Sequence, residues 1–328
     1  MLHQLFRSLG AGSLAIFLAA ALVLRAAAFA HDGGAAGEAA PALGPWGRWL
    51  AGGWARGGAL DWLVGSGLLA GLGYVASYTP QEYRLGVAGG FPGLVAVTLG
   101  SAAAWWLGFS PLIAGALALA LAAQRLFAGY RYQGASLPVY DCGLWVGAAW
   151  LVAPGFAWMG LWGALAIAQL RRFRLRDLLG LALGIATLPF LAGTYAYVVA
   201  DALPAFRQTL TAGLASPPDP AVLGASWPWI AVTALATGAA VGAFRILTTR
   251  RPIQEQRAAR MWYAMLAVGW VAMLWTGDGH PWGLAYVLYP LSVLLGLWLG
   301  ELTRERTDIV GVVVLALIGA GHLAYAYL

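Results

Sequence analysis

Long uninterrupted apolar runs are the feature that most constrains the fold of this chain. A helix that crosses a membrane needs about 20 mostly apolar residues, and runs near that length recur throughout the sequence. The chain is 61% hydrophobic and only 10% charged, with a mean hydropathy of +0.74, whereas soluble domains carry about 25% charged residues. Continuous runs also exclude an outer-membrane barrel, whose strands alternate apolar and polar residues. We therefore expect one all-α, polytopic transmembrane bundle over residues 1–328, with spans at 9–30, 59–79, 85–108, 111–128, 177–199, 228–247, 261–276, 283–300 and 308–327.

The segment 142–170 is interrupted by Pro154 and Gly155, which leaves two apolar halves too short to span. We expect a hairpin of two short helices, which brings the total to about eleven helical segments; one long bent helix is the alternative. Paired small residues at i, i+4 spacing allow close helix approach. Such pairs occur at Gly67/Gly71, Gly143/Gly147, Gly180/Gly184, Gly238/Gly242 and Gly296/Gly300.

The basic residues, all arginine, indicate the orientation in the membrane. With the N-terminus inside, fifteen of the nineteen arginines fall in or beside inner loops and three in outer loops, which is a strong positive-inside bias. This predicts a multi-pass protein of the bacterial inner membrane, with outer loops at 31–58 and 200–227. The inner runs 171–177 and 245–260 anchor this topology or contact anionic lipid head groups. A cleavable signal ending at "AFA", residues 28–30, is an alternative for the first segment.

Arg25 is the one arginine inside an apolar run, about one and a half turns before the outer end of the first segment. Its side chain either extends along the helix to the head groups or turns into the bundle, where an ionisable group is a candidate functional residue. The inward orientation predicts contact with an acidic side chain on the same side: Asp32, Glu38 or Asp61.

The predicted outer face carries the residues on which a chemistry can be built. Transfer of a sugar from a lipid-linked donor needs a carboxylate base and an arginine that holds the departing phosphate. Asp32 and Glu38 are the candidate catalytic residues. An amphipathic stretch, residues 45–58, predicts an interfacial helix or a pair of turns, with its tryptophans at head-group depth. The candidate substrate-binding residues are Arg25, Arg48, Arg56, Asp61, Asp278 and His280.

Other site interpretations have less support in the sequence. Five side chains on the outer face could ligate a metal: His31, Asp32, Asp278, His280 and His322. Their spacing matches no metal-binding motif, so we expect neither a metal nor another cofactor. On the inner side, Asp141 is expected to cap the N-terminus of the short hairpin, or else to contact an inner ligand.

Two stretches resemble an uncharacterised family of bacterial polytopic inner-membrane proteins: "LPVYDCGLWVGAAWLVAP" at 137–154 and "QLRRFRLRDLLGLALGIATLPFLAGTYAYV" at 169–198. This resemblance implies a role in an envelope pathway and no catalytic residue. A more distant similarity is to the GT-C class of membrane glycosyltransferases, in which Asp32 and Glu38 occupy the place of the acidic first outer loop. The chain differs from that class in lacking a paired acidic motif there.

Three functions therefore remain open. The chain could transfer a sugar from a lipid-linked donor at the outer face, or it could be a non-catalytic assembly or scaffold component. A transporter is less favoured because ionisable residues are almost absent near mid-membrane. The expected partners are membrane lipids, a lipid-linked sugar donor and other envelope proteins, with no nucleic acid.

Overall fold

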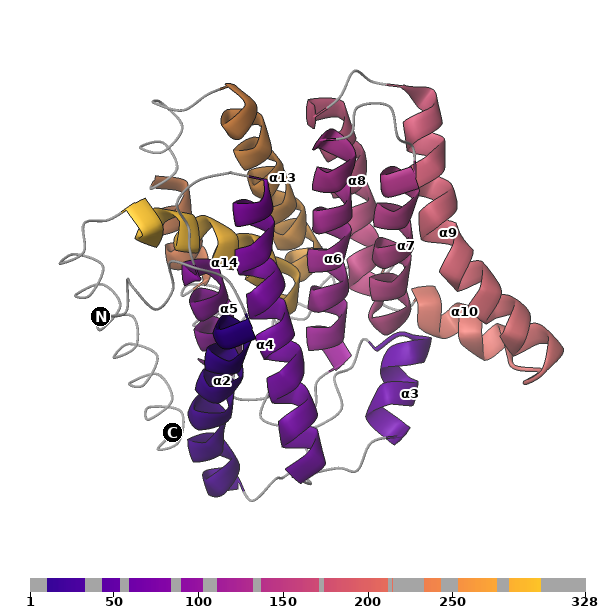
Figure 1. The fold of residues 1–328 in the computed structure, drawn as a ribbon. Coiled ribbons are helices and arrows are strands. Elements are labelled where there is room, and N and C mark those ends of the chain that lie inside the picture. Colours follow the sequence, from indigo (N-terminus) through magenta and orange to yellow (C-terminus); the bar gives the residue numbers. More distant parts are fainter. Residues whose placement is uncertain are drawn as a thin grey trace.

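The computed structural model describes the chain in eleven separate segments. These are residues 11–32, 43–53, 59–83, 90–102, 111–131, 137–170, 174–211, 214, 233–242, 253–275 and 283–301. Every regular element in these segments is helical (Figure 1), which confirms the all-α class. The named elements are α2 (Ala11–Asp32), α3 (Pro45–Gly53), α4 (Ala59–Glu82), α5 (Phe91–Ala102), α6 (Pro111–Arg131), α7 (Leu137–Val152), η2 (Pro154–Trp158), α8 (Met159–Leu170), α9 (Leu175–Val198), α10 (Leu203–Thr211), α13 (Ile253–Trp275) and α14 (Leu284–Glu301).

Three of these helices are long and apolar enough to cross a membrane: Ala59–Glu82, Pro111–Gly129 and Leu175–Val198. They correspond to the spans expected at 59–79, 111–128 and 177–199, so the chain has the helices of a membrane protein. Shorter apolar helices include Leu137–Val152 and Leu284–Gly300. The segment expected at 308–327 lies outside the described residues, and only 233–242 of the segment expected at 228–247 is described. The total of about eleven segments therefore stays a prediction.

Residues 137–170 fold as two helices joined by a short 3₁₀ turn at Pro154. α7 and α9 run in the same direction, because Gly143 of α7 faces Gly184 of α9 and Gly147, one turn later in α7, faces the next residue of α9, Ile185. α8 runs opposite to α9. Gly160 near the start of α8 faces Ile185, whereas Gly163, further along α8, faces the earlier residue Leu181. The chain thus turns back at Pro154, as in the hairpin interpretation.

One expectation for this hairpin is wrong. The sequence favours Asp141 as the N-cap, but α7 begins at Leu137, so Asp141 lies in the second turn of the helix. Pro138 explains the earlier start, because proline has no N–H to lose and a fixed φ that suits the first helical turn. Its ring therefore places the helix boundary one turn ahead of the acidic residue.

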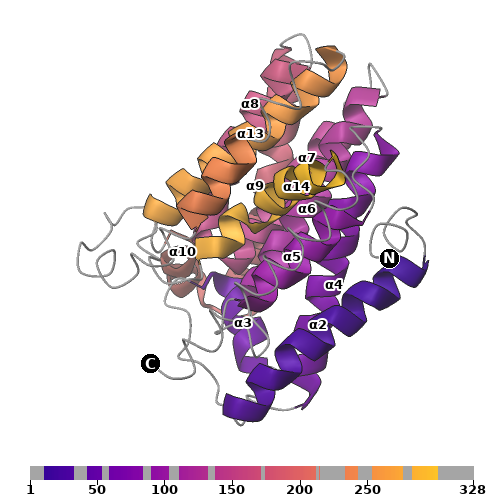
Figure 2. The ribbon, with the colours of Figure 1, turned by 90° about the vertical axis from the view of Figure 1, so that its left-hand side faces the viewer.

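The helices pack around an aromatic and aliphatic core. Trp262 of α13 contacts both Phe127 of α6 and Tyr289 of α14, with ring centroids 5.1 and 5.2 Å apart. Phe156 of η2 meets Tyr286 edge-on at 4.6 Å. Figure 2 shows α13 running alongside α8, with α2 and α4 on the other side of the bundle. The core therefore ties the C-terminal helices to the central hairpin.

Two short amphipathic helices, α3 and α10, lie at the end of the bundle where α7 finishes (Figure 1). The backbone N–H of Gly44, just before α3, donates to the carbonyl oxygen of Val152 at 2.8 Å. The indole N–H of Trp150 donates to the carbonyl oxygen of Leu210 in α10 at 3.2 Å. These helices belong to the predicted outer loops 31–58 and 200–227, so parts of both loops meet at one end of the bundle. The helical part of the amphipathic stretch 45–58 is confirmed over Pro45–Gly53.

Candidate functional site: the Arg25 cluster

Arg25 lies on the face of α2 that packs against α4, and its side chain is buried. Only 1% of the residue is exposed. One terminal nitrogen, Nη1, donates to the carbonyl oxygen of Trp62 at 3.2 Å and to the hydroxyl oxygen of Ser66 at 3.0 Å. Of the two orientations open to Arg25, the structure has the inward one.

A glycine on α4 makes the room that the guanidinium occupies. A Cβ placed on Gly65 would lie 2.6 Å from Nη1, 2.9 Å from Nη2 and 3.1 Å from Cζ of Arg25. Distances below 3 Å do not occur between such atoms without displacement. The absence of a side chain at Gly65 therefore lets the guanidinium approach the backbone of α4 closely.

Asp61 is the acidic residue nearest to this contact along α4. It stands one turn before Gly65, on the same face of the helix, and it is 5% exposed. It also lies in the first turn of α4, where the partial positive charge of the helix end favours a carboxylate. A buried guanidinium is costly in a bilayer unless an opposite charge or polar groups compensate it. Contact between the Arg25 and Asp61 charges stays a prediction.

We call Arg25, Asp61, Gly65 and Ser66, with the carbonyl group of Trp62, the Arg25 cluster. Its two hydrogen bonds join α2 to α4. At 1% exposure the guanidinium cannot be reached by a phosphate from solution unless α2 and α4 separate. The arrangement is therefore suited first to holding two helices in register, and to anion binding only after a movement.

The remaining predicted site residues differ in how much of each the structure describes. Arg48 lies on α3, is exposed, and donates from Nε to the carbonyl oxygen of Leu43 at 3.3 Å. Asp32 is the last residue of α2, and its side chain lies outside the described part. Outside the described residues altogether are Glu38, Arg56, Asp278 and His280. The structure thus brings Arg25 and Asp61 onto facing helices and places Arg48 on a helix that packs against α6 and α7.

Sequence reasoning missed Gly65 and Ser66. Their signal was a glycine–serine pair four and five residues after Asp61, inside a run that is otherwise apolar. The described residues hold no group of three or more His, Cys, Asp or Glu that could bind a metal. Most of the residues considered for a metal site lie outside that part of the chain.

No family model, curated protein or solved structure matches this chain. The resemblances to the uncharacterised inner-membrane family and to the GT-C class therefore stay predictions.

Proposed function

We propose that this chain is a multi-pass protein of the bacterial inner membrane, with its N-terminus inside, and that it works in an envelope pathway as a non-catalytic assembly component. The three long apolar helices and the bias of arginines toward one set of loops support the membrane location. The meeting of α3 and α10 at one end of the bundle supports an outer face built from both outer loops.

The state of Arg25 is the observation that carries the non-catalytic part of the proposal. A catalytic arginine that neutralises a departing phosphate must present its guanidinium to a substrate cavity. Arg25 instead directs Nη1 to two acceptors on α4 and is 1% exposed. The strongest candidate for a functional cation is thus engaged in holding helices together.

A second candidate function is transfer of a sugar from a lipid-linked donor at the outer face. One observation favours it: α2 continues as a helix from Arg25 to Asp32, so Asp32 stands about 10 Å beyond Arg25 along the axis. A base at the helix end and a cation below it could then act on one donor if α2 and α4 part.

The two candidates are separated by replacing the predicted bases. In membranes that contain the protein, Asp32→Asn and Glu38→Gln are assayed for transfer from a radiolabelled polyprenyl-phosphate sugar. The same variants are tested for restoring detergent resistance to cells that lack the chain. The assembly role predicts no transfer above that of empty membranes, and full restoration by both variants. Transfer by the unaltered chain that Asp32→Asn abolishes, at an equal level of folded protein, would overturn it.

A further inference from the structure

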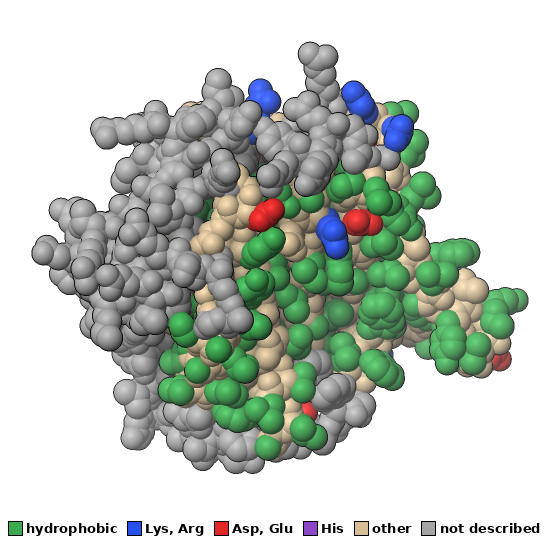
Figure 3. All heavy atoms as spheres, viewed as in Figure 1, with side chains coloured by type: hydrophobic (Ala, Val, Ile, Leu, Met, Phe, Trp, Pro, Cys, Tyr) green, Lys and Arg blue, Asp and Glu red, His purple; other side chains and the backbone are tan. Residues whose placement is uncertain are grey.

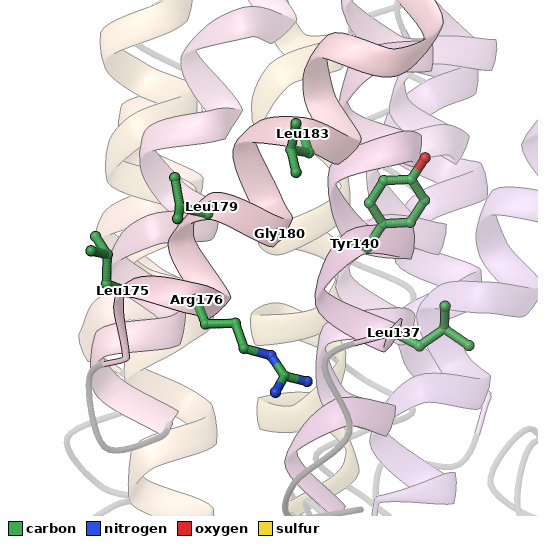
Figure 4. A pocket seen from close by; sticks show the side chains of 7 residues that line it. All are labelled: Leu137, Tyr140, Leu175, Arg176, Leu179, Gly180 and Leu183. Atoms are coloured by element: carbon green, nitrogen blue, oxygen red, sulfur yellow. The ribbon is translucent and has the colours of Figure 1, made fainter.

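A wedge-shaped groove lies between the beginnings of α7 and α9, far from the Arg25 cluster in the sequence. Its volume is about 440 Å³, within the range of roughly 300–1,000 Å³ that is usual for ligand pockets. Seven residues line it (Figure 4): Leu137, Tyr140, Leu175, Arg176, Leu179, Gly180 and Leu183.

The wedge exists because α7 and α9 touch at one level and diverge one turn earlier. A Cβ on Gly184 would lie 2.9 Å from the Cα atom of Gly143, so the two backbones are in contact there. A Cβ on Gly180, one turn before Gly184 on the same face of α9, would meet nothing within 4 Å. Gly180 is therefore not required for packing, and its missing side chain leaves the groove open.

The far end of the groove is closed by a polar bridge. The hydroxyl groups of Tyr140 and Thr187 lie 3.1 Å apart, which links α7 to α9. Thr187 in turn donates to the carbonyl oxygen of Leu183 within its own helix, at 2.6 Å. The groove thus has a defined length, from the first turn of α9 to this bridge.

The walls are apolar and the mouth is basic. Leu175, Leu179 and Leu183 are 66%, 55% and 64% exposed, so they form an apolar stripe on the outside of the bundle. At the mouth, the guanidinium of Arg176 extends into the space between the two helices (Figure 4). Arg174, just before α9, is also exposed, and the run "RRFRLRD" carries four arginines against one acid.

The shape and charge together identify the occupant. On the face shown in Figure 3, several basic side chains lie at one end, above a broad apolar surface, as at a membrane–water interface, and another basic side chain lies lower down, near acidic ones. An acyl chain matches the leucine wall, and a negatively charged head group matches the arginine mouth. Both helices also begin at this mouth, where their N-terminal ends favour an anion. A partner helix would match the apolar wall but would make no use of the excess of arginines in the run that leads into α9.

We propose that the α7–α9 groove binds one anionic phospholipid of the inner leaflet, with its phosphate at Arg176 and an acyl chain along Leu179, Gly180 and Leu183. The site is distinct from the Arg25 cluster. It rests on the membrane location proposed above and is independent of the assembly role.

Filling the groove is the direct test. The protein is placed in nanodiscs of equal parts phosphatidylglycerol and phosphatidylcholine, then released into mild detergent, and its retained lipid is identified by native mass spectrometry. The unaltered chain should retain one phosphatidylglycerol. Gly180→Leu should retain none, because its side chain would occupy the wedge. Gly67→Leu is the matched control, since a Cβ on Gly67 of α4 likewise meets nothing within 4 Å, and it should retain the lipid.

Removing the charge tests the head-group contact separately. Arg176→Gln should lower the preference for phosphatidylglycerol over phosphatidylcholine by about fivefold, as expected for one arginine near a lipid head group. Arg207→Gln, on exposed α10, should leave the preference unchanged. Leu179→Ser, which weakens the wall without filling the groove, should reduce retention of both lipids.

Three outcomes would overturn the proposal. These are retention by Gly180→Leu equal to that of the unaltered chain, equal retention of the two lipids by the unaltered chain, or loss of a bound protein subunit rather than a lipid in Gly180→Leu. The last result would assign the groove to a partner helix. Failure of the membrane location is a separate result, because it would appear as release of the protein from membranes by alkaline carbonate.

Discussion

Arg25 and Gly65 lie in contact across the α2–α4 interface, because the guanidinium occupies the space that a side chain on Gly65 would fill. The nearest approach would be 2.6 Å, between a Cβ at Gly65 and Nη1 of Arg25. Nη1 also makes the two hydrogen bonds to Trp62 and Ser66. The arginine and the glycine therefore form one packing unit, and a substitution of Gly65 is a test of the Arg25 hydrogen bonds.

Gly65→Ala should destabilise the protein. The added methyl group pushes the end of the Arg25 side chain away from its two acceptors on α4, and the loss of a hydrogen bond from a charged group costs about 1.5–3 kcal/mol. Alanine by itself favours a helix over glycine by about 1 kcal/mol, so the control must carry the same gain. Gly67→Ala provides it, since its Cβ meets nothing within 4 Å. In detergent, the midpoint temperature of thermal unfolding should be lower for Gly65→Ala than for Gly67→Ala. Equal midpoint temperatures would contradict the packing unit.

Asp61 and Arg25 should be energetically coupled. Removing one member of a buried ion pair costs about 3–5 kcal/mol, because the other charge is left uncompensated. We therefore expect Asp61→Asn and Arg25→Leu each to lower stability strongly, and the double variant to lower it by less than the sum. Glu82→Gln, at the exposed end of the same helix, is the control and should show no coupling to Arg25→Leu. Additive effects of Asp61→Asn and Arg25→Leu would mean that the carboxylate does not compensate this arginine.

Gly184 and Gly180 should respond oppositely to the same substitution. Gly184→Ala forces α7 and α9 apart, because the new Cβ would lie 2.9 Å from the Cα atom of Gly143, and we expect a loss of about 1–3 kcal/mol. Gly180→Ala should be neutral or stabilising by up to about 1 kcal/mol, the helix-propensity gain alone. Unfolding midpoints of the two variants test this directly. A destabilising Gly180→Ala would show that the helices do not diverge at that level.

The helix positions follow from local features of the sequence. The apolar run expected at 9–30 is observed as Ala11–Asp32, and the break expected at Pro154 is the observed turn. Apolar length and proline position are properties of the segment itself, so they can be predicted without knowledge of its neighbours. The same holds for the amphipathic helix at Pro45–Gly53.

The details of the site depend on neighbours that the sequence does not specify. Gly180 and Gly184 form one i, i+4 pair, yet only Gly184 is in backbone contact with α7. The difference arises from the angle between two helices, which is a tertiary property. Likewise, the sequence predicts three candidate carboxylates for contact with Arg25. That Arg25 lies opposite Gly65 and Ser66 could be seen only from the packing of α2 on α4.

The end of the bundle that carries α3 and α10 should face the periplasm. Cys142, the chain's one cysteine, is fully buried, so the protein with Cys142→Ala provides a background without thiols. On it, Arg48→Cys places a thiol on exposed α3 and Arg174→Cys places one before α9. We expect a membrane-impermeant maleimide to label Arg48→Cys in spheroplasts, and Arg174→Cys only after the membrane is permeabilised. Replacing an exposed arginine at either position leaves the core intact, so both variants should fold. The reverse labelling pattern would place the outer loops in the cytoplasm and would remove the basis for both proposed functions at the outer face.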